Sequence, residues 1–222
     1  MKQILKKIIP ANLIKKYFSI REYIKSIKNR IIRFFIKPQI PKNKDGKVLI
    51  HLGCGEKNDS RWINIDALPF PHVHYIQDVT NLSNLSSNIS DIIYASHTLE
   101  HTSHRKTIYV LKEWRRVLKT GGILRLAVPD FDKIINIYRE ENNNMKKIIE
   151  PLMGGQDYKY NFHYSMFNKE YLTDILHQAG FIKVEEWNPK TATYHTFYDW
   201  SSKLVTIDKK RYPISLNIEA IK

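Results

Sequence analysis

The stretch from Lys47 to Asp66, KVLIHLGCGEKNDSRWINID, constrains the fold of this chain more than any other. It opens with an apolar run at 48–52 that has the length and β-branched content of a buried strand. The run stops at Gly53-Cys54-Gly55, and a second short run at 62–65 ends on Asp66. Glycines let a backbone turn sharply and approach a ligand, and a carboxylate after the next strand can accept both hydroxyls of a ribose. The stretch therefore predicts the nucleoside-binding corner of an open parallel sheet, although such a glycine turn also occurs as a simple tight turn.

Apolar runs and helical patterns alternate through the rest of the chain. Further strands are predicted at 73–76, 91–95, 123–128, 181–187 and 214–221, and helices at 105–119, 130–138 and 168–179. Gly121 and Gly122 are expected to end the first of these helices, and 141–165 reads as polar and irregular. The alternation predicts a doubly wound α/β sheet, closed at its C-terminal end by an antiparallel pair of strands with no helical pattern between them.

The net charge of +14 is concentrated at the N-terminus, where residues 1–48 carry 14 Lys and Arg against two acids. The sequence predicts a basic amphipathic helical arm over 1–46 and a main domain over 47–222. Within 2–37, Ile20, Ile24, Ile27, Ile31 and Phe35 recur at helical spacing between basic residues. Three interpretations follow: the stripe packs on the main domain, the arm lies on an anionic membrane surface, or it is attracted to nucleic acid.

Several features indicate a cytoplasmic protein. Any contact with a membrane is expected to be peripheral and at its inner face. A single cysteine, Cys54, excludes an internal disulfide and fits a reducing compartment. No apolar run reaches the roughly 18 residues that span a bilayer. The basic N-terminus lacks the apolar core and small-residue cleavage site of a signal peptide.

Four stretches make residues 47–222 resemble a Rossmann-like (class I) S-adenosylmethionine-dependent methyltransferase. HLGCGE resembles the glycine motif of these enzymes, INID the acidic end of the second strand, and SHTLEH the end of the fourth. EWRRVLKTGGILRLAVPD resembles their helix, glycine turn and fifth strand. The chain is most similar to small bacterial members encoded among genes for surface-polysaccharide synthesis. The resemblance implies a mostly parallel seven-stranded sheet, S-adenosylmethionine as cofactor, and methyl transfer to a small-molecule or glycan acceptor, such as a sugar or a lipid-linked saccharide.

The resemblance also implies roles for individual residues. The expected cofactor contacts are Gly53, Cys54 and Gly55 around the methionine and ribose, Asp66 on the ribose hydroxyls, Asp78 by the adenine amino group, and Ser96 near the sulfonium. The sequence departs from the pattern at His51, where many members carry an acid, and at Lys57, which replaces a third glycine. The short link between the first two strands leaves room for a helix of one or two turns at most.

Methyl transfer from a sulfonium is an in-line displacement that needs orientation above all. A general base helps where the acceptor is a hydroxyl, and the candidates are His97, His101 and His163, with Glu100 orienting one of them or acting as the base. Each has a purely structural alternative, such as His101 capping a helix or His163 lining a polar loop.

The spacing of His97, Glu100, His101 and His104 also raises the question of a metal. Because His97 is predicted at a strand end and no H-E-x-x-H motif occurs, no metal is predicted.

Two other functions remain open from the sequence. The basic composition prompts a nucleic-acid methyltransferase, although the charge is confined to the arm and the fourth strand does not end in a base-gripping N-P-P-Y type of motif. A non-catalytic relative that binds the cofactor or a partner is the second alternative, because methyl transfer has no obligatory catalytic residue whose absence would show.

Overall fold

The computed structural model describes Ile24 and residues 27–222. Its strands are β1 (Leu49–Leu52), β2 (Trp62–Asp66), β3 (Tyr75–Ile76), β4 (Ser90–Ser96), β5 (Leu118–Pro129), β6 (Lys183–Glu186), β7 (Leu204–Ile207), β8 (Lys210–Pro213) and β9 (Ser215–Ile221). Its helices are η1 (Leu99–His101), α3 (Thr107–Val117), α4 (Phe131–Glu140), η2 (Met145–Lys147), α5 (Ile149–Met153) and α6 (Lys169–Gln178).

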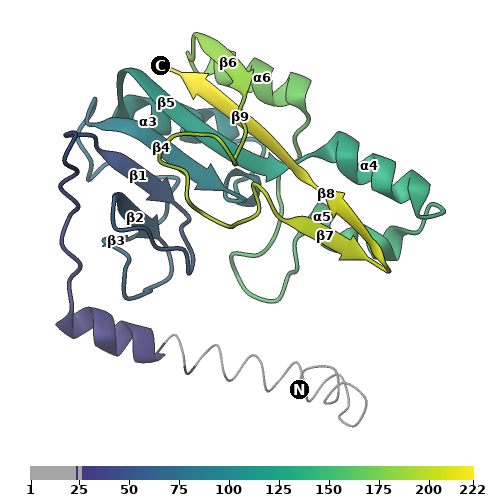
Figure 1. The fold of residues 1–222 in the computed structure, drawn as a ribbon, viewed down its shortest axis with the longest axis horizontal. Helices are drawn as coiled ribbons and strands as arrows, with labels where there is room; N and C mark the ends of the chain where they lie inside the picture. Colours follow the sequence, from purple (N-terminus) through teal and green to yellow (C-terminus); the bar gives the residue numbers. More distant parts are fainter. Residues whose placement is uncertain (1–23, 25–26) are drawn as a thin grey trace.

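Seven of the strands form one sheet in the order β3-β2-β1-β4-β5-β9-β6 (Figure 1). The first five pair in parallel, whereas β9 runs antiparallel to both β5 and β6. This confirms the predicted mostly parallel seven-stranded sheet and its antiparallel closure. The order reverses between β1 and β4, and open α/β sheets bind ligands outside the carboxyl ends of their strands at such a reversal.

One face of the sheet is covered by α3 and α6. Val110, Leu111, Trp114 and Val117 form the buried stripe of α3, at the spacing of one helix face. They pack into the main core with Leu172, Ile175 and Leu176 of α6 and with inward-facing residues of the central strands. The Asn168 side chain caps α6 by accepting a hydrogen bond from the Tyr171 amide, which fixes where the helix begins.

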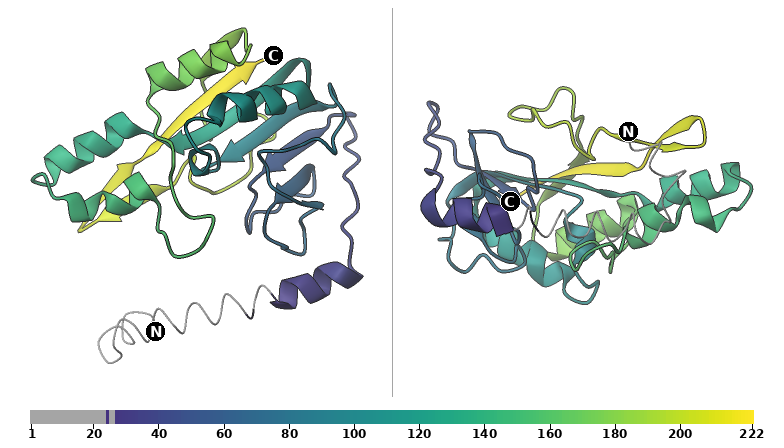
Figure 2. Two further views of the ribbon diagram at one scale, coloured as in Figure 1. Left: turned by 180° about the vertical axis from the view of Figure 1, so that it is seen from behind. Right: turned by 90° about the horizontal axis from the view of Figure 1, so that it is seen from below.

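The opposite face is covered by a loop in place of a helix. No helix lies between β1 and β2, as the short link predicts. Trp62 of β2 and Tyr94 of β4 instead pack against Phe197, which lies in the segment 188–203, and against Trp187, which comes just before it. Figure 2 shows this segment on the side of the sheet away from α3 and α6. Aromatic packing therefore covers this face of β1, β2 and β4, toward the amino ends of β1 and β2.

The sequence-based boundaries are wrong in three places. β5 begins at Leu118, so Gly121 and Gly122 lie inside the strand instead of ending a helix before it. These glycines pair with the C-terminal residue: the Gly121 amide donates to the Lys222 carbonyl, and the Lys222 amide donates to the Gly122 carbonyl. A Cβ on Gly122 would lie 2.9 Å from the Lys119 carbonyl oxygen, so the pair serves close backbone approach.

The other two corrections concern elements that the sequence analysis left as irregular chain. The segment 141–165 contains η2 and α5. The hairpin of β7 and β8 was not predicted, because each strand has only four residues and β8, KRYP, carries two basic residues and a proline.

The described part of the arm is helical over 27–35 (Figure 1). It is tied to the main domain by Arg33, which donates hydrogen bonds to the Val73 carbonyl at 2.8 Å and the His74 carbonyl at 2.9 Å. Its apolar side chains, however, are exposed: Ile24, Ile27, Ile31, Phe34 and Phe35. The interpretation that this stripe packs on the main domain is therefore wrong for these positions, while Ile20 and most of 2–23 lie outside the described residues. None of the described helices combines the length and apolarity that crossing a membrane requires.

Candidate functional site

The glycine turn after β1 is shaped by close packing. Gly53 adopts φ +63°, a left-handed conformation that L residues rarely adopt, and its amide donates to the Ile65 carbonyl at 2.9 Å. A Cβ at this position would lie 2.3 Å from Oγ1 of Thr98, a buried residue just after β4. Only glycine lets the turn approach the end of β4 this closely.

Asp66, the last residue of β2, holds the same turn from the other side. Its Oδ2 accepts a hydrogen bond from the Gly55 amide and its Oδ1 accepts one from the Leu68 amide, both at 2.7 Å. The side chain is largely buried, and burial raises the pKa of its carboxyl while the two amides oppose the shift. Each oxygen keeps a second lone pair, so the carboxylate can still accept hydrogen bonds from a ligand.

The structure brings every sequence-predicted site residue to one large open cleft at the carboxyl ends of the parallel strands. The residues named for the cofactor are Gly53, Cys54, Gly55, Asp66, Asp78 and Ser96, and those named for catalysis are His97, Glu100, His101 and His163. Asp78 differs from the others because it is exposed and accepts hydrogen bonds from the amide and hydroxyl of Thr80. Cys54 is buried, and burial raises its thiol pKa, so it is not a ready nucleophile.

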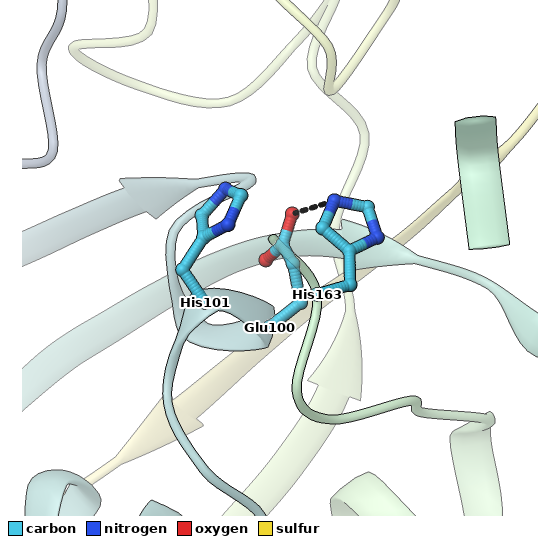
Figure 3. A group of neighbouring side chains, drawn as sticks. All are labelled: Glu100, His101 and His163. Carbon is cyan, nitrogen blue, oxygen red and sulfur yellow. Dashed lines mark ion pairs between the residues drawn. The ribbon is translucent and has the colours of Figure 1, made fainter. Parts of the chain in front are cut away.

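A buried carboxyl with histidines around it forms one wall of this cleft (Figure 3). Glu100, in η1, is 0 % exposed, and burial raises its pKa to about 8. Its Oε1 lies 3.4 Å from Nδ1 of His97 and 4.0 Å from Nε2 of His163. The ring centroids of His101 and His163 are 5.1 Å apart. His104, by contrast, is exposed and is not among the residues of the cleft.

The three imidazoles are held in their neutral form. Burial lowers the pKa of His97 to about 3 and that of His163 to about 4, and it lowers the pKa of His101 as well. His97 has a left-handed backbone with φ +49°, unusual for a residue with a side chain, which turns the chain sharply at the end of β4.

Several cleft residues escaped the sequence analysis. Thr98 contacts the glycine turn, His72 lies 3.8 Å by its Nε2 from Sγ of Cys54, and burial together with the charge of Asp66 raises the pKa of Tyr158. Trp200 and Lys203, in the segment that leads to β7, also line the cleft, and the ring centroid of Trp200 lies 5.6 Å from that of His97. Of these, only Tyr158 gave a signal in the sequence, because it lies close to two further tyrosines, Tyr160 and Tyr164.

His51, which departs from the acid expected from the resemblance, lies among aromatic rings. Its ring centroid is 4.6 Å from that of Phe197 and 5.0 Å from that of Tyr94. Burial lowers its pKa to about 3, so the side chain is neutral. It therefore belongs to the packing of the aromatic face.

Comparison with known proteins agrees with this architecture. Residues 56–126 match the family model described as a methyltransferase domain. No curated protein matches the chain.

Three solved structures illustrate the likeness of fold. The Burkholderia thailandensis 1,6-didemethyltoxoflavin-N1-methyltransferase, solved with its acceptor and S-adenosylhomocysteine, has a TM-score of 0.53 at 14% identity, over 96% of this chain and 86% of that one. A SAM-dependent methyltransferase from Archaeoglobus fulgidus has a TM-score of 0.51 at 18% identity, over 91% and 94%. A SAM-dependent methyltransferase from Thermotoga maritima, described as a possible histamine N-methyltransferase, has a TM-score of 0.50 at 17% identity, over 99% and 98%. The chain therefore has the fold of the S-adenosylmethionine-dependent methyltransferases, and residues 56–126 within it match a methyltransferase domain.

Proposed function

We propose that this protein transfers a methyl group from S-adenosylmethionine to a hydroxyl or amine of a small-molecule or glycan acceptor, such as a sugar or a lipid-linked saccharide. One observation carries the proposal. The glycine turn, the acid after β2 and the Glu100–histidine group all line a single cleft at the strand-order reversal of the sheet. A cofactor held by the first two presents its reactive end toward the third.

The residues present fit this cofactor. The cradle at Gly53 has no space for a Cβ, which suits a turn that must lie close to a ligand. Asp66 would accept the ribose hydroxyls with its remaining lone pairs, and Asp78 would lie beside the adenine. Ser96, the last residue of β4, lines the cleft and would lie near the methionine end.

When bound, the cofactor supplies a methyl group on a sulfonium, which needs no acid to leave. The protein must hold the acceptor in line with that methyl group and exclude competing water. His101 and His163, being neutral, can accept a hydrogen bond from the acceptor, and Glu100 and His97 lie beside them.

Titration calorimetry followed by a transfer assay tests this function. We expect S-adenosylmethionine and S-adenosylhomocysteine to bind the full chain with one site and a Kd of about 1–100 µM. We then expect label from methyl-labelled cofactor to appear in nucleotide sugars or lipid-linked saccharides and not in duplex DNA or RNA. Failure of both cofactor forms to bind would contradict the proposal and favour the non-catalytic alternative. Transfer to nucleic acid alone would contradict the choice of acceptor.

We also propose that the N-terminal arm, residues 1–37, places the enzyme at an anionic membrane surface. The support is the row of exposed apolar side chains on a segment rich in lysine and arginine. Phe34 is 79 % exposed and Phe35 is 77 % exposed. Apolar burial in the lipid interface and attraction to anionic headgroups would act together, each basic residue near the surface contributing about 1 kcal/mol.

We expect the full chain to sediment with anionic vesicles and to lose binding at least 10-fold when Phe34 and Phe35 are both changed to Ala. Tyr109→Ala, which removes an aromatic ring that is 68 % exposed from α3, is the matched control and should leave vesicle binding unchanged. The membrane role would be refuted if Tyr109→Ala and the double variant changed vesicle binding equally. It would also be refuted if the full chain did not sediment with the vesicles.

A further inference from the structure

The carboxyl group of Glu100 lies completely buried and without a partner. Both Oε1 and Oε2 are inaccessible to solvent, and no described residue forms a hydrogen bond to either of them. A buried carboxyl without a hydrogen-bond donor or a cation beside it destabilises the fold by roughly several kcal/mol. Native proteins therefore pair such a group with a donor or a cation. The groups around it are imidazoles: His97 directly after β4, His101 next to Glu100 in sequence, and His163 from the loop that follows α5.

Hydrogen bonds behind the rings determine which nitrogens face Glu100. The hydroxyl of Ser215 donates to the Trp200 carbonyl at 2.6 Å, so it accepts from Nε2–H of His97 at 2.8 Å. Nδ1 of His97 therefore carries no proton, and it points at Oε1 of Glu100 from 3.4 Å. Similarly, a carbonyl can only accept, so Nδ1 of His101 donates to the Phe162 carbonyl at 3.0 Å and its Nε2 is left bare.

The result is a set of electron-pair donors that face one another. One ligand atom each from Glu100, His101 and His163 lies within 4.8 Å of the others. Two ligands at about 2.1 Å from a common ion lie roughly 3–4.2 Å apart, so a small movement of the side chains would bring these atoms into coordination. Hydrogen bonds from a ligand imidazole to a backbone carbonyl, as His101 makes, are the usual support of metal-binding histidines.

The backbone also fixes His163 against Glu100. The amides of Tyr164 and Ser165 both donate to the Glu100 carbonyl, at 2.8 and 3.1 Å. Gly154, at φ +78°, lets the chain fold back, because a Cβ there would lie 2.5 Å from the Asn161 carbonyl oxygen and 3.1 Å from the His163 ring. Two segments far apart in sequence are thus joined at this one point.

We propose that Glu100, His101 and His163 bind a divalent first-row transition-metal ion, with His97 beside Glu100, and that the open side of the ion faces the acceptor. Imidazole and carboxylate ligands suit Zn²⁺, Mn²⁺, Fe²⁺ or Co²⁺ better than Mg²⁺ or Ca²⁺, which prefer oxygen. Three protein ligands with an open position are typical of catalytic sites.

Resting on the proposed function, this site narrows the acceptor to a hydroxyl. A hydroxyl coordinated by the ion loses its proton more readily, and the proton passes to solvent water. The new O–CH₃ bond then forms as the S–CH₃ bond of the cofactor breaks, with sulfur keeping the bonding electron pair and leaving as a neutral thioether.

Calorimetry with the metal alone, on full chain first stripped with a chelator, tests the site. We expect Zn²⁺ to bind at one site with a Kd of about 1 µM or tighter, and Co²⁺ to give visible d–d bands typical of imidazole coordination. Glu100→Gln and His163→Gln should each weaken Zn²⁺ binding at least 100-fold. His104→Gln, which removes an exposed histidine from the same stretch, should change nothing.

The main rival is a carboxyl that simply keeps its proton. In that case Glu100→Gln would be tolerated, and Zn²⁺ would bind wild type and both cluster variants alike or not at all; either result overturns the proposal. A parallel titration of S-adenosylhomocysteine into stripped protein separates the two proposals. Cofactor binding without Zn²⁺ binding would overturn only the metal site, whereas Zn²⁺ binding without cofactor binding would contradict only the methyltransferase function.

Discussion

Gly53→Ala is expected to destabilise the protein by roughly 2–5 kcal/mol and to abolish measurable cofactor binding. Two costs combine. An L residue at φ +63° is strained by about 1–2 kcal/mol. The new Cβ would also lie 2.3 Å from Oγ1 and 2.7 Å from Cγ2 of Thr98, and overpacking of this kind costs about 1–3 kcal/mol. Thr98 is buried and β-branched, so it cannot swing aside as a long flexible side chain would.

Urea unfolding and S-adenosylhomocysteine titration measure the two effects separately. Gly46→Ala is the matched control, because Gly46 has a similar φ of +71° but open space around its Cβ and a position outside the cleft. Gly46→Ala should be destabilised only by the strained backbone conformation, and it should bind the cofactor normally. Adding Thr98→Ala to Gly53→Ala should restore part of the stability by removing the clashing atoms, a non-additive result that two independent sites would not give. Equal effects of Gly53→Ala and Gly46→Ala would contradict the close-packing explanation.

The alternation of strands and helices could be predicted from the sequence because the strands carry strong local signals. The apolar runs at β1 and β4 and the motifs at their ends specify both element type and sequence of elements. The segment 188–203 could not be assigned in this way. Its aromatic side chains, such as Phe197, follow neither the helical nor the strand period, and they cover the sheet only because no helix lies between β1 and β2.

For the candidate site too, some features could be predicted from the sequence and others could not. Residues directly after strands, such as Asp66 and His97, could be placed near one another because the carboxyl ends of parallel strands share an edge. The sequence named His163 as a candidate, but it could not predict that His163, and not His104, lies beside Glu100. His104 lies close to Glu100 in sequence yet is exposed, while His163 reaches Glu100 through a loop folded back at Gly154. The unpartnered state of the Glu100 carboxyl is likewise a property of the packed structure alone.

Asp66→Asn is expected to weaken cofactor binding about 100-fold or more. In the proposed function this carboxylate accepts both ribose hydroxyls, and hydrogen bonds to a charged acceptor are worth about 1.5–3 kcal/mol each. The substitution also places an amide NH₂ group opposite the Gly55 or Leu68 amide, donor against donor, where Asp66 now accepts at 2.7 Å from each. The glycine turn therefore loses its support at the moment the ligand loses its acceptor.

Asp91→Asn provides the control that separates folding from binding. Asp91 also holds a backbone amide, that of Val48 at 2.9 Å, but it lies at the start of β4 and outside the cleft. We expect this variant to lose stability in urea without losing affinity for S-adenosylhomocysteine. If Asp66→Asn behaved in the same way, with lower stability and unchanged affinity, Asp66 would be a support of the turn and not a ligand of the ribose.

The dependence of wild-type affinity on pH gives an independent check on Asp66. Burial raises the pKa of this carboxyl, so it gains its proton at a higher pH than an exposed aspartate does. A protonated carboxyl accepts fewer hydrogen bonds, so the affinity should be complete above the raised pKa and fall as the pH decreases through it. Because Asn at this position cannot titrate, the remaining affinity of Asp66→Asn should not show this decrease. A decrease of the same size in wild type and variant would assign it to another group and remove Asp66 from the binding site.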